Sequence, residues 1–222
     1  MRKFVPAYEG NLRKHALSVP PCISECSGIR VFGRRIKSLV FSTDVAIIKN
    51  INADAIIAVY PFTPQPAITQ AIIGVSEVPV FCGVGGGLTN GVRSASMAAY
   101  VEHQGAYGVV CNSKIGVETI HAIKDAVEIP VVYTVISENT DIQPYLTAGV
   151  DIINVSGAAR TPEIVGALRQ RYPELPIIAT GGPTEESILA TIRAGANAIT
   201  YTPPSSASLF AKTMADNRSE LE

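Results

Sequence analysis

A pair of glycines beside hydroxyl side chains is the part of this sequence best suited to binding a ligand. Gly181 and Gly182 follow an apolar run that ends at Thr180, and helical spacing begins at Thr184. Glycine lets a ligand approach the backbone closely, and the start of a helix presents N–H groups at the positive end of its dipole. The pattern predicts a phosphate-binding loop. The plainer alternative is that both glycines turn the chain and Thr184 caps the helix.

Ser205 and Ser206 extend this expected phosphate site. They follow the next apolar run along the chain, and their hydroxyl and N–H groups could contact the same anion. Pro203 and Pro204 stand directly before them and supply no N–H group, so the usual backbone cradle is incomplete. The phosphate-binding residues that we predict are Gly181, Gly182, Ser205 and Ser206.

Two carboxylates and one lysine are the candidates for catalysis. Asp44 and Glu138 each follow an apolar run. A carboxylate that is desolvated in a closed pocket has a raised pKa and can act as a general base near neutral pH. Asp44 could equally cap a helix, and Glu138 could be a solvated loop residue. Lys114 could form a Schiff base, steady an anion or start its helix.

Neutral polar side chains that follow the apolar runs are expected to contact the substrate. Hydroxyl and carboxamide groups can hydrogen-bond a substrate hydroxyl or carbonyl. The substrate-binding residues that we predict are Tyr60, Asn112, Asn154, Ser156 and Thr180. The glycine-rich residues 83–91 lack the G-x-G-x-x-G spacing of a dinucleotide loop, and they favour close ligand approach or a lid hinge.

The histidines and cysteines show no metal-binding pattern. The three histidines are scattered along the chain, and Cys22 and Cys26 lack a third or fourth ligand nearby. The other two cysteines lie in apolar runs, where a small buried thiol is their ordinary role. We therefore expect no metal and no cofactor.

The elements that position these residues alternate along the chain. Short runs rich in Val and Ile are each followed by apolar residues at helical spacing. The runs are apolar on both faces, which is typical of a parallel sheet covered on both sides. The expected strands are 38–43, 54–60, 79–84, 106–111, 130–136, 151–156, 176–180 and 197–202. The expected helices are 44–51, 64–76, 89–104, 114–128, 140–148, 161–171, 184–194 and 206–217.

Eight strand–helix units predict an α/β fold, a (β/α)8 TIM barrel, as one domain over residues 38–222. The loops after the carboxyl ends of the strands build the active face of such a barrel, and all the candidate residues fall there. Residues 1–37 precede the barrel as an N-terminal extension. Their prolines and glycines predict loop and turn, and we expect the extension to pack on the barrel across its bottom.

Composition and charge limit the classes of function. Hydrophobic residues make up 47% of the chain and charged residues 17%, which suits a large core and argues against disorder. We find no apolar run long enough for a membrane span and no secretory signal, so we expect a cytoplasmic protein with no membrane partner. Residues 1–37 hold eight basic and two acidic residues, so the remainder carries the negative charge. This asymmetry indicates either a solvated segment or an anion-binding arm.

Residues 106–206 resemble the ribulose-phosphate-binding group of barrels, which includes thiamine-phosphate synthase-like and phosphosugar epimerase-like enzymes. The resemblance is carried by residues 178–182, Ile-Ala-Thr-Gly-Gly, by the helix that ends in Ala194-Gly195-Ala196, and by the strand that follows. Within this group, the chain is most similar to glycerol uptake operon antiterminator-related proteins. The resemblance covers about half the chain, and its motif identifies a superfamily rather than a reaction.

Two functions follow as hypotheses. The first is an enzyme that acts on a small phosphorylated metabolite as an isomerase, epimerase or lyase, with phosphate held after the seventh and eighth strands; a hydrolase is not excluded. The second is an antiterminator-like, ligand-sensing regulator whose basic extension binds RNA. The apolar residues 67–73 fit either a contact in a homo-oligomer or packing against the barrel.

Overall fold

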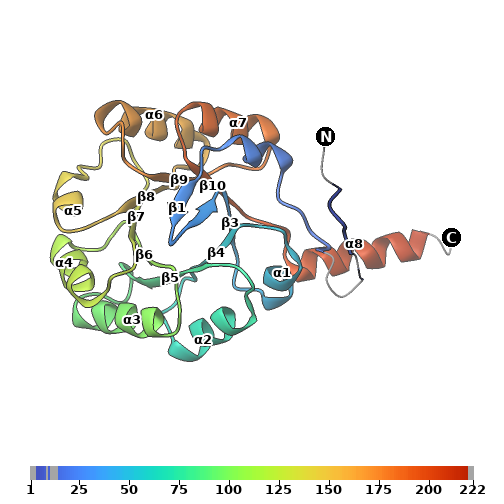
Figure 1. Cartoon of the computed structure of the whole chain (residues 1–222), viewed down its shortest axis with the longest axis horizontal. Helices are drawn as coiled ribbons and strands as arrows, with labels where there is room; N and C mark the ends of the chain where they lie inside the picture. The colour runs from blue at the N-terminus through green and yellow to red at the C-terminus, as the bar shows by residue number, and fades with distance from the viewer. Residues whose placement is uncertain (1–3, 9, 11–14, 220–222) are drawn as a thin grey trace.

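Eight parallel strands close into a barrel, and a helix follows each strand (Figure 1). The computed structural model describes residues 4–8, 10 and 15–219. The hydrogen-bonded order around the barrel is β10-β3-β4-β5-β6-β7-β8-β9. The strands are β3 (Ser38–Phe41), β4 (Ala55–Ala58), β5 (Val80–Gly85), β6 (Gly108–Cys111), β7 (Val131–Val135), β8 (Ile152–Val155), β9 (Ile177–Thr180) and β10 (Ala198–Tyr201).

Seven helices form an outer ring around the strands in Figure 1: α1 (Val45–Asn50), α2 (Pro66–Val75), α3 (Val92–His103), α4 (Val117–Ala126), α5 (Gln143–Thr147), α6 (Thr161–Arg171) and α7 (Glu185–Arg193). The last helix is α8 (Ser206–Ser219). A short 3-10 turn, η2 (Ala158–Arg160), precedes α6. Each of the eight barrel strands and eight α-helices overlaps the range that the sequence predicts, so the predicted (β/α)8 barrel is confirmed. No helix in the described part of the chain is both long and apolar enough to span a membrane.

The apolar strands are buried on both faces because they separate two layers of the core. In β7, Val131 and Tyr133 belong to the layer between strands and helices, whereas Val132 packs inside the barrel. Successive side chains of a strand point to opposite faces, so a strand covered on both sides needs an apolar residue at nearly every position. This requirement explains the short runs of Val and Ile that repeat along the sequence.

Polar residues at the starts of three strands hydrogen-bond the neighbouring strand. A side-chain oxygen of Asp54 accepts the N–H of Ser38 at 3.0 Å. Asp151 accepts the N–H of Val131 at 2.9 Å, and Asn197 accepts that of Ile177 at 2.9 Å. These bonds tie together strand ends that would otherwise leave an N–H group without a partner.

A hairpin fills the bottom of the barrel, where the strands begin. It consists of β1 (Ile29–Val31) and β2 (Arg34–Ile36), joined by Phe32 and Gly33. Both joining residues have positive φ, 45° and 80°, as a tight two-residue hairpin turn requires. The side chains of Val31 and Ile36 pack with the interior cluster of the barrel. The sequence predicts only loop and turn in this segment, so the hairpin is a feature that we did not expect.

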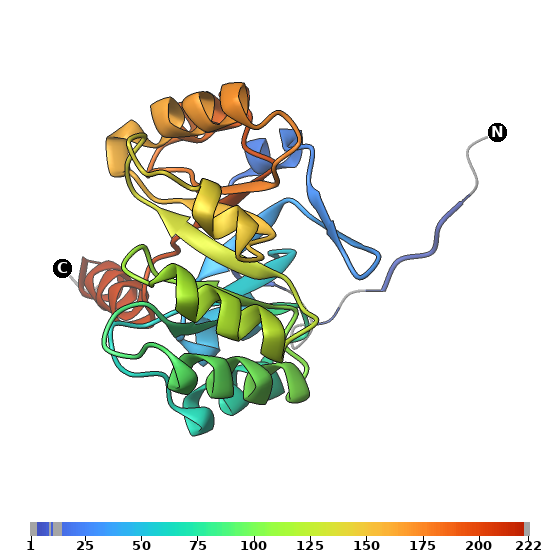
Figure 2. The ribbon, with the colours of Figure 1, turned by 90° about the vertical axis from the view of Figure 1, so that its left-hand side faces the viewer.

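The last helix lies away from the barrel. Figure 1 shows α8 projecting outward, and Figure 2 shows it on the opposite side of the barrel from the hairpin. None of its described side chains is buried, and Phe210 is 73% exposed. The 3-10 turn η1 (Pro21–Glu25) packs beside α7, and its residues Cys22 and Ile23 are buried.

Candidate functional site

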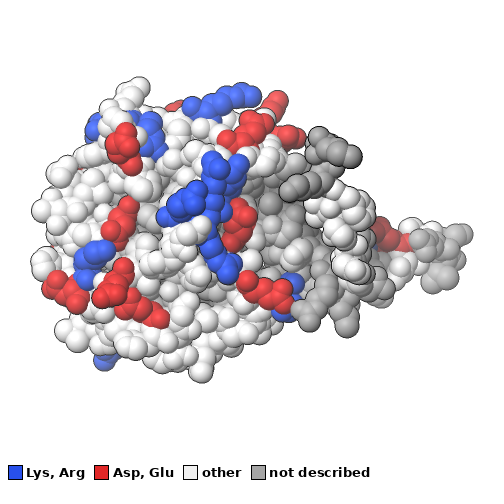
Figure 3. Space-filling model, in the orientation of Figure 1, with Lys and Arg blue, Asp and Glu red and all other residues white. Residues whose placement is uncertain are grey.

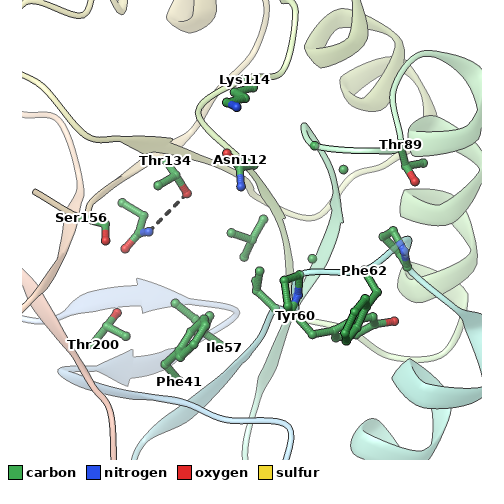
Figure 4. Close-up of a pocket in the computed structure, with 18 of the residues that line it drawn as sticks. Phe41, Ile57, Tyr60, Phe62, Thr89, Asn112, Lys114, Thr134, Ser156 and Thr200 are labelled. Atoms are coloured by element: carbon green, nitrogen blue, oxygen red, sulfur yellow. Dashed lines mark hydrogen bonds between the residues drawn. The ribbon is translucent and has the colours of Figure 1, made fainter.

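A cavity of about 700 Å³ opens at the carboxyl ends of the strands (Figure 4). Inward-facing residues alternate along each strand, and the lower ones, such as Phe81 and Val132, fill the barrel. Nearer the mouth, the inward positions hold small or polar residues, including Gly83, Thr134 and Thr200. The cavity exists because these side chains are too small to fill the upper half of the barrel.

The glycine-rich loop after β5 is fixed against the strand beside it. The N–H of Asn112 donates to the carbonyl of Gly85 at 2.9 Å. Gly86 has φ +98°, and a Cβ placed on it would lie 2.7 Å from the carbonyl oxygen of Asn112. Only glycine fits at this position, so the backbone of the loop lies directly against that of Asn112.

The structure brings six of the candidate residues together around the cavity. All five predicted substrate-binding residues line the cavity, and Lys114 lies with them. They are Tyr60, Asn112, Lys114, Asn154, Ser156 and Thr180.

Lys114 is the only charged residue among the described residues that line the cavity. Its side chain makes no ion pair or hydrogen bond within the described part of the chain. The remainder of the lining is apolar or neutral, with no Asp, Glu, His or Cys among its described members. Lys114 is exposed, and an ammonium group at the cavity that has no protein counterion favours an anionic ligand.

Two buried polar atoms on the cavity wall lack hydrogen-bond partners among the described residues. The carboxamide nitrogen of Asn154 donates to the hydroxyl of Thr134 at 3.3 Å, which leaves the carboxamide oxygen unpartnered. The hydroxyl of Thr200 is also unpartnered, and this residue is only 6% exposed. Figure 4 shows Thr134, Ser156 and Thr200 along one side of the cavity. Buried polar groups without partners are costly, so these atoms point to a polar ligand that would satisfy them.

Asp44 lies outside the cavity lining and caps α1. Its carboxylate accepts the N–H groups of Ala46 and Ile47 at 3.0 and 3.3 Å, and that of Ser206 at 3.3 Å. The pKa of Asp44 is lowered, first by the hydrogen bond with the Ser206 side chain and then by the backbone N–H groups. This shift is opposite to the raised pKa that we expected for a general base, and the capping alternative describes its contacts.

Glu138 also lies outside the cavity lining, in an ion pair with Arg160. Its own backbone N–H and then the guanidinium group of Arg160 lower the pKa of its carboxyl group. Arg160 in turn contacts Glu163 at 3.2 Å. The shift again runs opposite to the expected direction, and a catalytic role for Asp44 or Glu138 stays a prediction.

The four expected phosphate ligands surround the starts of α7 and α8 and do not line the cavity. The N–H of Gly181 donates to the carbonyl of Thr200 at 3.2 Å. Thr184 and Ser187 form a capping box at the start of α7, whose first turn carries two glutamates. At the start of α8, the hydroxyl of Ser205 contacts that of Ser208 at 2.8 Å, and the N–H of Ser206 donates to Asp44.

These internal contacts already occupy several of the donor groups that a phosphate would use. The carboxylates of the first turn of α7 also disfavour an anion there. The predicted cap at Thr184 is confirmed. Phosphate binding by Gly181, Gly182, Ser205 and Ser206 stays a prediction.

Sequence reasoning missed the apolar lining residues and two threonines within the strands. The missed residues include Phe41, Ile57, Phe62, Leu88, Thr134 and Thr200. Thr134 and Thr200 were detectable, because each occupies an inward position near the end of an otherwise apolar strand. Phe41, Ile57 and the loop residues carry no comparable signal in the sequence.

Comparison with known proteins defines the class of fold. No protein-family model matches the sequence, and no curated protein matches it. Among solved structures, 2,3-dimethylmalate lyase, a PEP mutase/isocitrate lyase superfamily member, is 13% identical with a TM-score of 0.65, over 90% of this chain and 84% of that one. Phosphonopyruvate hydrolase, solved with oxalate and Mg²⁺, is 15% identical with a TM-score of 0.63, over 88% of this chain and 83% of that one.

A third structure, phosphoenolpyruvate phosphomutase from Streptomyces platensis subsp. rosaceus, is 15% identical with a TM-score of 0.62, over 82% of this chain and 80% of that one. At such low identity, the likeness shows the fold alone, a (β/α)8 barrel. These neighbours share the TIM-barrel fold. They do not support the narrower resemblance to ribulose-phosphate-binding barrels or to antiterminator-related proteins.

Proposed function

We propose that this chain is an enzyme of lyase or mutase type that acts on a small organic acid in the barrel cavity. The observation that carries the proposal is the position of Lys114, the one charged side chain among the described lining residues. The structural neighbours support it, since they are named for reactions of phosphonopyruvate, phosphoenolpyruvate and dimethylmalate, all of which are acids.

The lining supplies the groups that such a reaction needs for binding and orientation. The ammonium group of Lys114 would hold a carboxylate, phosphate or phosphonate through a charge-assisted hydrogen bond. The free oxygen of Asn154 accepts a hydrogen bond from a substrate hydroxyl, and the hydroxyl of Thr200 donates to a carbonyl or oxyanion. Donors fixed around a developing negative charge stabilise the transition state in which that charge forms.

The lining favours bond cleavage or group migration over epimerisation. Epimerisation needs a proton acceptor on each face of the substrate. The described lining residues include no Asp, Glu, His or Cys, and the Tyr60 hydroxyl already accepts the N–H of Gln65 at 2.8 Å.

A Mg²⁺ ion, as named for the phosphonopyruvate hydrolase structure, does not fit this donor set. Magnesium is held in proteins by carboxylates, often together with substrate phosphates. No carboxylate lines the cavity among the described residues, and no group of three metal-ligating side chains occurs among them. In the proposed reaction, Lys114 supplies the positive charge.

The regulatory alternative has less support. The described basic residues of the extension lie over the hairpin, at the opposite end from the cavity (Figure 3). Arg35 donates to the carbonyl of Ser27 at 2.7 Å, and Lys37 donates to that of Ser24. The other four basic residues of this segment, at positions 2, 3, 13 and 14, lie outside the described residues.

Calorimetric titration with oxalate, malate, inorganic phosphate and methylphosphonate tests the proposal. We expect at least one of these anions to bind, and Lys114→Gln to weaken its binding at least about tenfold through the lost charge-assisted bond. Lys212→Gln, on the exposed face of α8, is the matched control and should bind as the unmodified protein does. Equal affinity in the Lys114 and Lys212 variants would refute the assignment.

A further inference from the structure

The wall of the cavity divides into two arcs of different chemistry. Strands β3, β4 and β5 are neighbours in the barrel, and their ends and following loops contribute mainly apolar groups. We call this side the apolar arc; its main side chains are Phe41, Ile57, Val59, Phe62 and Leu88. Strands β6 to β10 are also consecutive around the barrel, and they contribute the polar arc.

The polar arc contains Lys114, Thr134, Asn154, Thr180 and Thr200. Each of the five strands β6 to β10 therefore places a polar side chain on the cavity at or just past its carboxyl end. In Figure 4, Lys114, Thr134 and Thr200 lie apart from Tyr60 and Phe62 across the cavity. The lining is sorted by chemistry around the barrel, so a ligand that fills it meets the one charge and most of the hydrogen-bonding side chains on the same side, with Tyr60 and Thr89 as the polar exceptions on the other.

The apolar arc carries side chains that water solvates poorly. Leu88 is 82% exposed and Phe62 is 68% exposed, although both line the cavity. An apolar group that covered them would gain free energy in proportion to the surface removed from water. A contiguous exposed apolar surface beside a pocket is typical of a binding site rather than of a solvated loop.

The loop that bears Phe62 is held in place. Pro61 and Pro64 fix its backbone φ, and the N–H of Gln65 donates to the Tyr60 hydroxyl at 2.8 Å. The apolar arc is thus a preformed wall, so a ligand that binds it pays little ordering entropy in this loop.

The cavity is also larger than a small acid needs. Its volume of about 700 Å³ falls within the range of roughly 300–1,000 Å³ that holds ligands of drug size. An acid of three or four carbons bound at Lys114 would occupy the polar arc and leave Phe62 and Leu88 uncovered.

We infer that the substrate is an amphipathic organic acid, with its anionic head on the polar arc at Lys114 and an apolar tail on the arc of Phe41, Ile57, Phe62 and Leu88. This inference rests on the proposed function for the head group and adds the chemistry of the tail. The polar arc holds the head close to the groups that would do chemistry, and the apolar arc selects the length of the tail.

A series of linear carboxylates, from propanoate to octanoate, measures the tail separately from the head. Calorimetric titration of the full chain should give an affinity that rises about two- to fourfold with each added methylene group, as buried CH₂ groups do, until the arc is filled. Octan-1-ol, which has the tail without the charge, should bind at least about tenfold more weakly than octanoate.

Variants at the two exposed lining residues locate the tail. Phe62→Ser and Leu88→Ser change exposed side chains, so the fold should be retained. Together they should flatten the rise of affinity with chain length, so octanoate should lose much more affinity than propanoate. Phe210→Ser, on α8 and outside the cavity, is the matched control and should keep the full dependence.

The outcomes separate the inference from the proposed function. If propanoate and octanoate bind equally well and Lys114→Gln weakens both, the head site stands and the tail site is refuted. If the dependence on chain length survives in the double serine variant, the tail binds elsewhere and the inference is likewise refuted. If no carboxylate of the series and none of the small anions binds at millimolar concentration, both fail.

Discussion

The two ends of the barrel use polar residues in opposite ways. At the bottom, Asp54, Asp151 and Asn197 each accept hydrogen bonds from a neighbouring strand, and a hairpin fills the space between the strands. At the mouth, Asn154 and Thr200 have polar atoms that no described residue satisfies. Polar residues at strand starts therefore stabilise the barrel, whereas those at strand ends keep the unpartnered atoms on which our proposed function rests.

The largest effect that this comparison predicts is at the bottom. The guanidinium group of Arg169 donates to the carbonyls of Pro173, Leu175 and Gly195 and to the side chain of Asn197, at 2.6–2.8 Å for the shortest contact with each. Arg169→Met leaves these acceptors without their charged donor. We expect the free energy of unfolding in urea to fall by about 3 kcal/mol.

Arg171→Met is the control for this prediction, because Arg171 is exposed on the same helix, and it should change stability by less than about 0.5 kcal/mol. Neither variant should alter the affinity for anions by more than about twofold, since neither residue lines the cavity. A large loss of anion binding in Arg169→Met at a temperature where it remains folded would mean that the two ends are coupled.

A smaller effect of opposite sign is expected at the mouth. Thr200→Val replaces a buried hydroxyl that has no partner among the described residues with a methyl group. The free energy of unfolding should rise by about 0.5–1 kcal/mol, because the cost of burying that hydroxyl disappears. Thr191→Val provides the contrast, since the Thr191 hydroxyl is buried and donates to the carbonyl of Ser187 at 2.9 Å.

Thr191→Val should therefore lose about 1 kcal/mol. Urea denaturation of both variants measures the two signs in one experiment. If Thr200→Val is destabilised as much as Thr191→Val, the hydroxyl of Thr200 has a structural partner and the contrast between the ends is lost.

The pH dependence of stability gives a third, smaller effect. The pKa of Asp44 is lowered below its ordinary value of 3.8 in the folded protein, so its stabilising contribution is complete above the unfolded pKa. This contribution is lost as the pH falls through the lowered folded pKa, below about pH 4. Asp44→Asn should keep most of the cap and should show a shallower loss of stability over this acidic window.

Thermal unfolding between pH 7 and pH 2 follows this loss of stability. Asp216→Asn, which changes an exposed carboxylate on α8, is the matched control and should follow the unmodified protein. Parallel curves for Asp44→Asn and the unmodified protein would show that the contacts of Asp44 are not maintained in solution.

The smallest effect concerns the thiols, where we expect no reaction at all. All four cysteines are buried and unpaired. Burial raises the pKa of Cys26 to about 11 and those of Cys82 and Cys111 to about 12, so the reactive thiolate is scarce at pH 8. A thiol-specific reagent should modify none of them in the folded protein and all four in urea. Rapid reaction of one native thiol would reveal an opening in the core.

The barrel was predictable from the sequence because its signal is local and repeated. A strand such as residues 131–135 is apolar at nearly every position, and the same pattern recurs eight times. The neutral polar residues were predictable for the same reason, since Asn112 and Asn154 fall at fixed places relative to those strands. The rule that strand ends form the active face then brings them together.

The remaining features depend on contacts between distant parts of the chain. The lowered pKa of Asp44 depends first on its hydrogen bond with Ser206, which lies 162 residues away in the sequence. Gly181 lies against Ile188 and Ile199, where a Cβ would lie 2.8 and 2.7 Å from their side chains. Neither contact can be read from local spacing, so the sequence alone offers both a chemical and a structural interpretation of each residue.

The hairpin of β1 and β2 has a consequence for the proposed reaction. Because Val31 and Ile36 pack among the interior side chains, the described part of the barrel is filled at the bottom, and the cavity opens at the carboxyl ends of the strands. In the proposed enzyme, product would leave by the route through which reactant enters, so bound product would exclude reactant. Steady-state kinetics should accordingly give product inhibition that competes with the reactant, and it should strengthen as the product retains more of the reactant's hydrocarbon portion.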